Sequence, residues 1–325
     1  MSNSETSYAK ELATLGHALQ QASQLCRRVK SELVISTLAK ADRSPVTVAD
    51  YGSQALICRA IKSVFPDDSI VAEEDADALR LPAQAGVCAE VARRVAHVCP
   101  VNPPDEVLRW IDYGDALGDS DRFWTLDPID GTKGFLRGGQ YAIAVALIEQ
   151  GNVAVAGLAC PNLDGGIGAE FMAVRGCGAH QVEPASGLVR VSATADCAQA
   201  RFCESVESAH SAHDDAARVA RALGITAASI RLDSQAKYAV VARGEADIYL
   251  RLPTRRTYVE RIWDHAAGSL LLREAGGCVT DCAGRPLDFS RGKGLDRNRG
   301  IVATNGLLHG QVLAALKELG LGQPN

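Results

Sequence analysis

Apolar residues recur every three or four positions along residues 7–33, which is the spacing that places them on one face of an α-helix. The residues on this face are Leu12, Leu15, Leu19, Ala22, Leu25, Cys26 and Val29. A second stripe with helical spacing runs from about residue 51 to 65, and the Pro-Asp-Asp at 66–68 ends it. The apolar run at 69–72 then predicts a short buried strand that leads into an acidic string at 73–75.

The middle of the chain changes to a period of two. Residues 141–148 alternate larger apolar side chains with alanines, and residues 153–160 alternate again after a Gln-Gly-Asn turn at 150–152. This combination predicts a β-hairpin. Further short runs at 169–174 and 179–182 continue the pattern, so we expect an antiparallel meander.

The last third of the chain mixes both kinds of pattern. Helix-like stretches lie at 214–223, 233–242, 264–275 and 307–319, and short apolar runs lie at 247–252 and 301–304. Alternation of this kind is typical of an α/β half, whereas the first part is typical of α+β. Because no repeat and no low-complexity linker separates the two halves, we expect them to pack tightly.

Residues 76–121 fit neither pattern well. The segment contains a helical patch at 87–98, two consecutive prolines at 103–104 and a stretch rich in Gly and Asp at 114–121. We interpret it as an insertion with its own helices. Since it leaves and returns beside two acidic motifs, we expect it near the opening of a site.

Composition narrows the classes of function. The chain has 325 residues, of which 47% are hydrophobic and 22% charged, and 34 basic against 39 acidic residues give a net charge of −5. A mildly acidic protein has no general electrostatic reason to bind nucleic acid, so an anionic substrate would need a local basic pocket or metal ions. The only basic cluster, at 291–299, is a short Gly-rich loop without interleaved aromatic residues.

The chain carries no signal for export or for membrane insertion. Residues 1–10 lack the basic-then-apolar order of a signal peptide, and no stretch approaches the ~18 apolar residues that span a bilayer. Ten cysteines are scattered without a Cys-x-x-Cys pair. We therefore expect reduced thiols in a cytoplasmic protein.

The chemistry is concentrated in the string Asp-Pro-Ile-Asp-Gly-Thr at 127–132. Pro128 sets a defined turn after the apolar run 123–126, and that turn can aim Asp127, Asp130 and the Ile129 carbonyl at one point. Hard cations such as Mg²⁺ prefer this set of oxygen ligands. Strings of this kind are also common in ordinary turns. Taken alone, the string therefore predicts a turn more strongly than it predicts a metal site.

Three further acids lie at the ends of predicted elements. Asp50 precedes a helix and Asp264 lies where a helix starts, so each has helix capping as its structural alternative. Glu73 ends a strand, where it points either into a cleft or into bulk water. Spacing alone does not bring these acids together.

The strings at 73–75, 127–132 and 263–268 together resemble the three signatures of the lithium-sensitive, Mg²⁺-dependent phosphatase superfamily, which includes inositol monophosphatase. The resemblance extends over residues 44–304. The Gly-Thr-Lys-Gly-Phe-Leu-Arg-Gly at 131–138 and the runs at 206–214, 232–238 and 249–253 are similar to its bisphosphate nucleotidase branch. This resemblance implies a layered α-β-α-β-α sugar-phosphatase fold with an antiparallel N-terminal sheet and a mixed C-terminal sheet. It also implies hydrolysis of the 3′-phosphate of 3′-phosphoadenosine 5′-phosphate and of its 5′-phosphosulfate analogue.

The same resemblance implies roles for individual residues. Two to three Mg²⁺ ions would be bound by Glu73, Asp127, the Ile129 carbonyl, Asp130 and Asp264. Asp50 and Thr132 would form the pair that activates the attacking water. The substrate contacts would be Gly131, Thr132, His210, Ser234, Lys237, Arg251 and Asp264.

The second phosphate of such a substrate requires cations and hydrogen-bond donors. Lys237 and Arg251 would supply the charge, and His210 and Ser234 would supply donors. Without the resemblance, we would interpret Lys237 and Arg251 as solvated surface charges. We would interpret His210 as a capping or surface histidine. Trp263 reads as a core residue.

The expected organisation is a metal-binding α+β domain at 1–187, which contains the insertion, and a nucleotide-recognition α/β domain at 188–325. We expect a small nucleotide as the partner, no nucleic acid and no membrane, and a monomer or weak oligomer. The alternatives are a phosphatase for inositol phosphates or sugar bisphosphates, and a catalytically inactive nucleotide sensor. The sensor is disfavoured because all the metal-binding acids and the Asp50–Thr132 pair are present.

Overall fold

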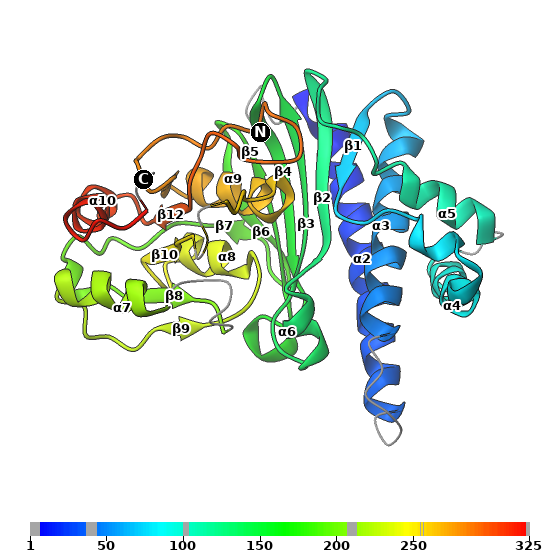
Figure 1. The fold of residues 1–325 in the computed structure, drawn as a ribbon, viewed down its shortest axis with the longest axis horizontal. Coiled ribbons are helices and arrows are strands. Elements are labelled where there is room, and N and C mark those ends of the chain that lie inside the picture. Colours follow the sequence, from blue (N-terminus) through cyan, green and yellow to red (C-terminus); the bar gives the residue numbers. More distant parts are fainter. Residues whose placement is uncertain are drawn as a thin grey trace.

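The protein is built from five alternating layers of helices and sheets (Figure 1). The computed structural model describes residues 7–36, 44–99, 104–206, 213–253, 255 and 257–322. Helices α2 (Ala9–Ser36) and α3 (Ser44–Val64) cover the outer face of the first sheet, and α8 (Ala236–Ala242) and α9 (Ala266–Glu274) lie between the two sheets. Helices α7 (His213–Ala222) and α10 (His309–Glu318) cover the second sheet. The predicted α-β-α-β-α layering is confirmed.

The first sheet runs in chain order through the antiparallel meander that the period-two pattern predicts. Its strands are β1 Ser69–Ala72, β2 Arg122–Asp130, β3 Ala142–Glu149, β4 Asn152–Cys160, β5 Ala169–Val174, β6 Gly178–Glu183 and β7 Gly187–Leu188. Only the β1–β2 pair of this sheet is parallel. The turn at 150–151 joins β3 to β4, as predicted.

The second sheet is mixed, as expected. Its strands are β8 Phe202–Glu204, β9 Ile230–Arg231, β10 Ile248–Arg251, β11 Cys278–Thr280 and β12 Ile301–Thr304, in the order β11-β12-β10-β8-β9. Strand β10 is parallel to β8 and antiparallel to β12. Strands β8, β9 and β11 have two or three residues each, which is too short for alternation to reveal them in the sequence.

Three apolar cores fill the spaces between layers. The first contains Leu19, Ile57 and Trp124 between the first two helices and the first sheet. The second, around Phe171 and Tyr238, joins the two sheets through α8 and α9, and a third lies beneath α7 and α10. All of the named side chains are buried. The extensive second core explains why the two halves pack tightly.

Helix α3 begins at Ser44, well before the predicted start near residue 51. Pro45 therefore stands in the first turn of the helix, where its missing N–H costs no hydrogen bond. The prediction was late because the residues of this first turn carry no clear apolar stripe.

The insertion at 76–121 contains helices of its own, as predicted. These are α4 (Ala85–Ala96) and α5 (Pro104–Asp112), preceded by the 3₁₀ turns η1 (Ala78–Arg80) and η2 (Pro82–Gln84). Its last part returns to the edge of β1, where the Ala72 amide donates to the Gly114 carbonyl at 2.8 Å and the Ala116 amide donates to the Ile70 carbonyl at 3.0 Å. The insertion thus ends beside the strand that leads into Glu73.

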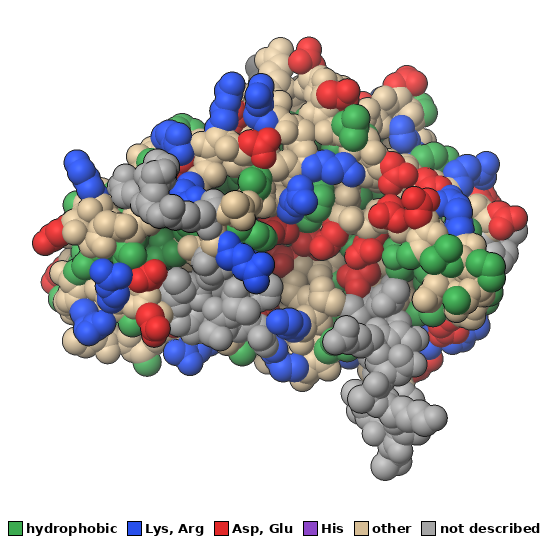
Figure 2. Space-filling model, in the orientation of Figure 1, with side chains coloured by type: hydrophobic (Ala, Val, Ile, Leu, Met, Phe, Trp, Pro, Cys, Tyr) green, Lys and Arg blue, Asp and Glu red, His purple; other side chains and the backbone are tan. Residues whose placement is uncertain are grey.

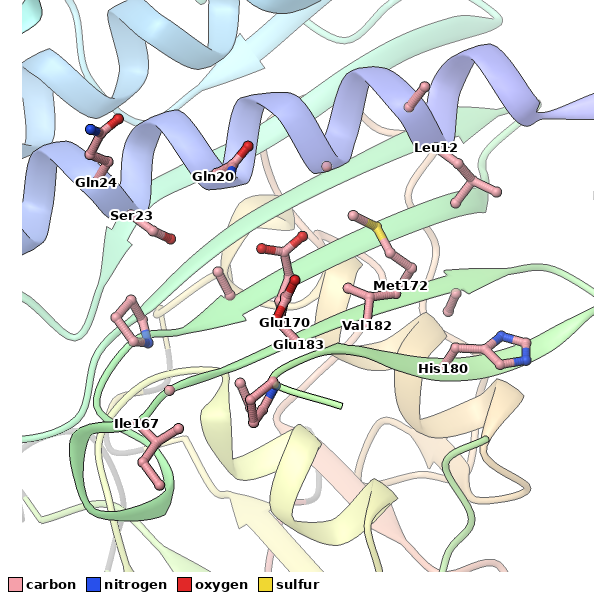
Figure 3. Close-up of a pocket in the computed structure, with 18 of the residues that line it drawn as sticks. Leu12, Gln20, Ser23, Gln24, Ile167, Glu170, Met172, His180, Val182 and Glu183 are labelled. Atoms are coloured by element: carbon pink, nitrogen blue, oxygen red, sulfur yellow. The ribbon is translucent and has the colours of Figure 1, made fainter. Parts of the chain in front are cut away.

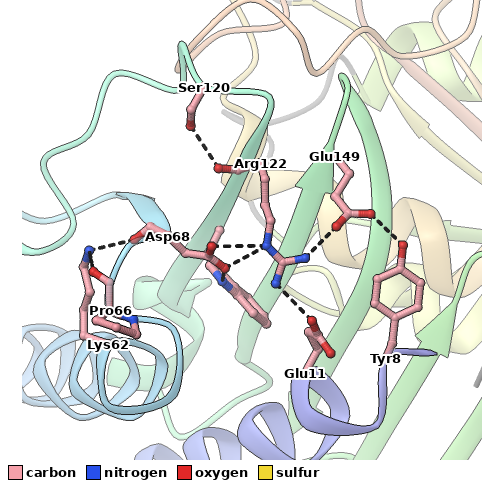
Figure 4. A network of polar contacts seen from close by, with 9 residues as sticks. Tyr8, Glu11, Lys62, Pro66, Asp68, Ser120, Arg122 and Glu149 are labelled. Atoms are coloured by element: carbon pink, nitrogen blue, oxygen red, sulfur yellow. Dashed lines mark hydrogen bonds and ion pairs between the residues drawn. The ribbon is translucent and has the colours of Figure 1, made fainter. Parts of the chain in front are cut away.

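Arg122, at the start of β2, connects four elements at one end of the first sheet (Figure 4). Its guanidinium donates to Asp68 at 3.0 Å, Glu149 at 2.6 Å and Glu11 at 3.0 Å. These three acids come from the loop before β1, the end of β3 and the start of α2. Trp124 adds a hydrogen bond to Asp68 at 2.8 Å. Arg122 therefore adds a polar link between the start of the first helix and one end of the sheet.

A groove of about 1170 Å³ lies between α2 and strands β5 and β6 (Figure 3). Leu12, Met172 and Val182 form its apolar part, and Gln20 and Glu170 face it from opposite sides.

No helix in the described part of the chain is long and apolar enough to cross a membrane.

Candidate active site

A cleft of about 340 Å³ opens where β2 ends against the start of α8. In Figure 2, Asp and Glu side chains gather in a hollow near the middle of this face, and Lys and Arg side chains lie around it. The residues that line the cleft are Glu73, Asp127, Ile129, Asp130, Gly131, Thr132, Lys133, Gly134, Ser205, Asp233, Ser234, Gln235, Lys237, Tyr249, Arg251, Tyr258 and Asp264. Among them are all the residues predicted as metal ligands.

The end of β2 presents its two acids through an irregularity in the strand. The register with β3 shifts between Asp127 and Asp130, at the position of Pro128, which cannot donate to a neighbouring strand. Asp127 is buried, and its Oδ1 accepts a hydrogen bond from the Ile129 amide at 3.1 Å. Asp130 accepts from the Gln235 amide at 2.6 Å, which ties β2 to the start of α8.

Gly131 follows with a φ of +86°, a left-handed conformation that glycine adopts without steric cost. A Cβ at this position would lie 3.0 Å from the Cβ of Ser234. The tight turn therefore lets the 127–132 string approach the 233–235 segment closely. Helix α6 (Thr132–Leu136) begins at the next residue.

Glu73 and Asp264 reach the same cleft from distant parts of the chain. Glu73 follows β1, which pairs with β2 in parallel, so both strands end at the same edge of the sheet. Asp264 closes the 3₁₀ turn η6 (Ile262–Asp264), and its Oδ2 accepts from the Arg251 guanidinium at 3.2 Å. Helix α9 has His265 at its N-cap position, so Asp264 does not cap it.

The four carboxyl groups repel one another in the absence of a cation. Desolvation, followed by the charges of Asp264 and Glu74, raises the pKa of Glu73 to about 7. Burial and the neighbouring Glu73 raise the pKa of Asp127 well above its ordinary value, and the two side chains share a hydrogen bond. Burial also raises the pKa of Asp264, although Arg251 opposes the change. This arrangement favours a bound cation.

A second set of possible ligands lies beside the first. Ligand atoms of Glu260, Asp264 and His265 come within 4.8 Å of one another. However, Glu260 Oε2 already accepts from Arg251 Nε at 2.8 Å and from His265 Nε2 at 3.1 Å, and the other nitrogen of His265 pairs with the Tyr238 hydroxyl at 2.8 Å. Because a fixed guanidinium occupies this set, the acids that line the cleft fit a metal better.

Of the predicted catalytic pair, Thr132 lines the cleft, whereas Asp50 is not among the lining residues and lies only close enough to Glu74 and Glu73 for their charges to interact. Asp50 lies inside α3 and is buried, so the capping alternative is wrong, because the helix starts six residues earlier. Burial, together with the charges of Glu74 and Glu73, raises the pKa of Asp50 well above its ordinary value. The Thr132 hydroxyl donates to the Ile129 carbonyl at 3.3 Å.

Lys237 and Arg251 are not solvated surface charges. Lys237 is 4% exposed, and its Nζ donates to the Ser234 carbonyl at 2.8 Å. Arg251 is paired with both Glu260 and Asp264. Ser234 is buried and has a φ of +73°. Trp263 is buried, as predicted. His210 lies outside the described residues.

Two residues that shape the site, Gln235 and Glu260, were not predicted from the sequence as functional residues. The Gln235 side chain donates to the Trp263 carbonyl at 2.8 Å and accepts from the Gly268 amide at 3.0 Å, so it positions the turn that carries Asp264. The sequence signal that could have identified Gln235 was its position within the string at 232–238. Glu260, which pairs with Arg251, had no recognisable pattern around it.

The layered fold and the acidic cleft define the class of protein. The sequence profile of the inositol monophosphatase family matches residues 5–321, so the chain belongs to that family. The solved inositol monophosphatase from Anabaena (Nostoc) sp. PCC 7120 superposes with a TM-score of 0.66 at 22% identity, over 96% of this chain and 97% of that one, and it shows the shared fold.

Curated relatives are more similar in sequence. The 3′(2′),5′-bisphosphate nucleotidase of Emericella nidulans is 44% identical, over 96% of this chain and 99% of the relative. The protein of the same name from Oryza sativa is also 44% identical, over 96% and 94%. That of Schizosaccharomyces pombe is 42% identical, over 88% and 89%.

Proposed function

We propose that this chain is a 3′(2′),5′-bisphosphate nucleotidase, which hydrolyses the 3′-phosphate of 3′-phosphoadenosine 5′-phosphate to give AMP and phosphate. The convergence of Glu73, Asp127, Asp130 and Asp264 on one cleft carries the proposal, since it suits hydrolysis of a phosphoric monoester. The names of the curated relatives, which match over almost their whole length, support the choice of substrate.

Mg²⁺ is the cation that we propose for this cleft, in two to three sites. The donors are all oxygens, namely the four carboxylates and the Ile129 carbonyl, which suits a hard cation. The crowding of partly desolvated carboxyl groups supports the fit. When bound, Mg²⁺ would neutralise charge on the phosphate and lower the pKa of a water molecule.

We assign proton transfer to Asp50 and Thr132. The Thr132 hydroxyl would orient the attacking water, and Asp50 would accept the proton. The water oxygen joins the phosphorus as the bond from phosphorus to the 3′-oxygen breaks, and the released 3′-oxygen takes up a proton from solvent to become the 3′-hydroxyl. General-base assistance of this kind contributes about 10²–10⁴-fold in rate.

The remaining cleft residues would bind the nucleotide. Ser234, Lys237 and Arg251 line the cleft and offer hydrogen-bond donors, and His210 belongs to the same proposed set. The Gly131 turn and Asp264 would contact the substrate beside the reacting phosphate. We accordingly propose that residues 1–187 carry most of the metal ligands and residues 188–325 recognise the nucleotide.

We also propose that the protein acts in the cytoplasm, as a monomer or weak oligomer, on small nucleotides and not on nucleic acid. All ten cysteines lie within the described residues, and no disulfide joins them. That state suits a reducing compartment.

The test is phosphate release from a panel of substrates with Mg²⁺ titration and added Li⁺. We expect 3′-phosphoadenosine 5′-phosphate to give the highest kcat/KM, a requirement for Mg²⁺ and inhibition by Li⁺. Faster hydrolysis of inositol 1-phosphate would refute the nucleotidase assignment, and the metal centre would then serve a different phosphatase.

A further inference from the structure

Gln54 lies inside α3, and its side chain is completely buried. Its Nε2 donates two hydrogen bonds, to the Glu74 carbonyl at 2.6 Å and to the Ile111 carbonyl at 3.1 Å. Its Oε1 accepts a hydrogen bond from the Glu74 amide at 3.0 Å. Both amide hydrogens and the oxygen of this side chain are therefore bonded to main-chain atoms of other segments.

These bonds join the helix that carries Asp50 to the loop that carries Glu73 and to the insertion. Ile111 lies in the last turn of α5, where carbonyl groups have no partner within the helix, and α5 packs against α3 (Figure 1). Tyr51, also in α3, shares a hydrogen bond with the Glu74 carboxyl group. Residue 74 is thus held to α3 through its backbone and through its side chain.

The insertion holds the residue on the other side of Glu73. The Ala72 amide donates to the Gly114 carbonyl at 2.8 Å. Gly114 packs so closely that a Cβ at this position would lie 2.6 Å from the Cβ of Ala72 and 2.8 Å from Nε2 of Gln54. Hydrogen bonds therefore fix the backbone one residue before and one residue after Glu73, and the backbone of Glu73 can shift only if one of these contacts breaks.

We propose that Gln54 is a positioning residue for Glu73, and that the insertion acts through it on the metal centre. Gln54 does not line the cleft, so it acts through the backbone of residue 74. The proposal rests on the proposed function, because it takes Glu73 as a Mg²⁺ ligand. Groups that orient a metal ligand contribute about 10–100-fold to metal affinity or activity. The insertion then contributes to the metal site although none of its described residues lines the cleft.

The alternative is a purely structural role, since a buried amide that bonds main-chain atoms stabilises the fold wherever it lies. Asn305 provides a matched control for this alternative. It is buried, its Nδ2 donates to the Thr194 carbonyl at 2.8 Å, and its Oδ1 accepts from the Leu308 amide at 3.2 Å. Asn305 lies beside the start of β10, whereas the cleft residue Arg251 ends that strand.

The test uses three variants of the full-length protein. Gln54→Met and Asn305→Leu each replace a buried amide by an apolar side chain of similar length. Gly114→Ala keeps the Gln54 amide but displaces it, because the added Cβ would lie 2.8 Å from Nε2. Isothermal titration calorimetry with Mg²⁺, in the absence of substrate, measures the Kd for the metal, and thermal unfolding measures the Tm.

We expect Gln54→Met to raise the Kd for Mg²⁺ by about 10–100-fold. Gly114→Ala should raise it less, because the amide is displaced and not removed. Asn305→Leu should lower the Tm, as Gln54→Met does, but it should bind Mg²⁺ as tightly as the wild type. The Mg²⁺ concentration that gives half-maximal hydrolysis of 3′-phosphoadenosine 5′-phosphate should rise in proportion to the Kd.

Two results would overturn the proposal. One is a folded Gln54→Met protein that binds Mg²⁺ like the wild type, and the other is an equal loss of affinity in Asn305→Leu. If the circular dichroism spectrum shows that Gln54→Met does not fold, Gly114→Ala decides. A lowered Tm with an unchanged Kd for Mg²⁺ in Gly114→Ala would show that these contacts serve stability only.

The metal readout also separates this proposal from the proposed function. If inositol 1-phosphate is the better substrate while Gln54→Met still weakens Mg²⁺ binding, the nucleotidase assignment fails and the positioning role stands. If 3′-phosphoadenosine 5′-phosphate is the best substrate while Gln54→Met leaves the Kd for Mg²⁺ unchanged, only the positioning role fails.

Discussion

Replacing Glu170 by glutamine should stabilise the protein at alkaline pH. Glu170 lies on β5, faces the groove under α2, and pairs across the sheet with Glu183 on β6 (Figure 3). Desolvation, and then the charge of Glu183, raises the pKa of Glu170 from 4.5 to about 7. No ion pair to Glu170 occurs among the described residues. Its negative charge is therefore unfavourable in the folded state.

The sign and the size of the expected change in the free energy of unfolding follow from the linkage between proton binding and folding. Because the folded state holds the proton of Glu170 more tightly than the unfolded state, the contribution of Glu170 to the stability of the wild type falls as pH rises from 4.5 to about 7. At about 1.4 kcal/mol per pH unit, the full cost above that window is at most about 3 kcal/mol. The side chain is partly exposed, so we expect Glu170→Gln to gain about 1–2 kcal/mol at pH 8 and almost nothing at pH 4.

Urea unfolding of the wild type and of Glu170→Gln between pH 4 and pH 8 measures this difference directly. Glu183→Gln should give only the smaller part of the stability gained by Glu170→Gln, because desolvation is the larger cause of the raised pKa of Glu170. Glu318→Gln, on the exposed end of α10, is the control and should change stability by less than about 0.5 kcal/mol. A difference between Glu170→Gln and the wild type that does not vary with pH would refute the reasoning.

Three further predictions concern single residues. At saturating Mg²⁺, Asp130→Asn should lower kcat by more than Thr132→Ala, for which we expect a loss of at least about 100-fold; near-normal turnover of Asp130→Asn would exclude Asp130 as a ligand. Arg122→Ala should cost about 3 kcal/mol in urea unfolding, since it leaves three acids without their shared cation, and a loss below about 1 kcal/mol would show that water replaces the network. Gly268→Ala should cost about 1–3 kcal/mol, because its Cβ would lie 2.3 Å from Cδ2 of the buried Tyr238 ring; an unchanged Tm would show that the ring can move aside.

Much of the fold could be predicted from local pattern. The helix beginning near residue 9, the hairpin with its turn at 150–151 and the mixed second half follow from spacing that each segment carries by itself. Strand β9, with two residues, is beyond such reasoning, because pairing with β8 defines it. The start of α3 at Ser44 was missed because its first turn lacks an apolar stripe.

The candidate site also has a part that local spacing predicts and a part that depends on tertiary packing. Asp127 and Asp130 lie together for a local reason, because four residues and one proline constrain their turn. Only the tertiary structure brought Glu73 and Asp264 to that turn, through the parallel β1–β2 pair and the Gln235 bridge between α8 and η6. It also decided that Arg251 is paired while Arg261, Arg291 and Lys293 are not. Local spacing restricts only neighbours in the chain, whereas the partners of a charge depend on which distant elements pack beside it.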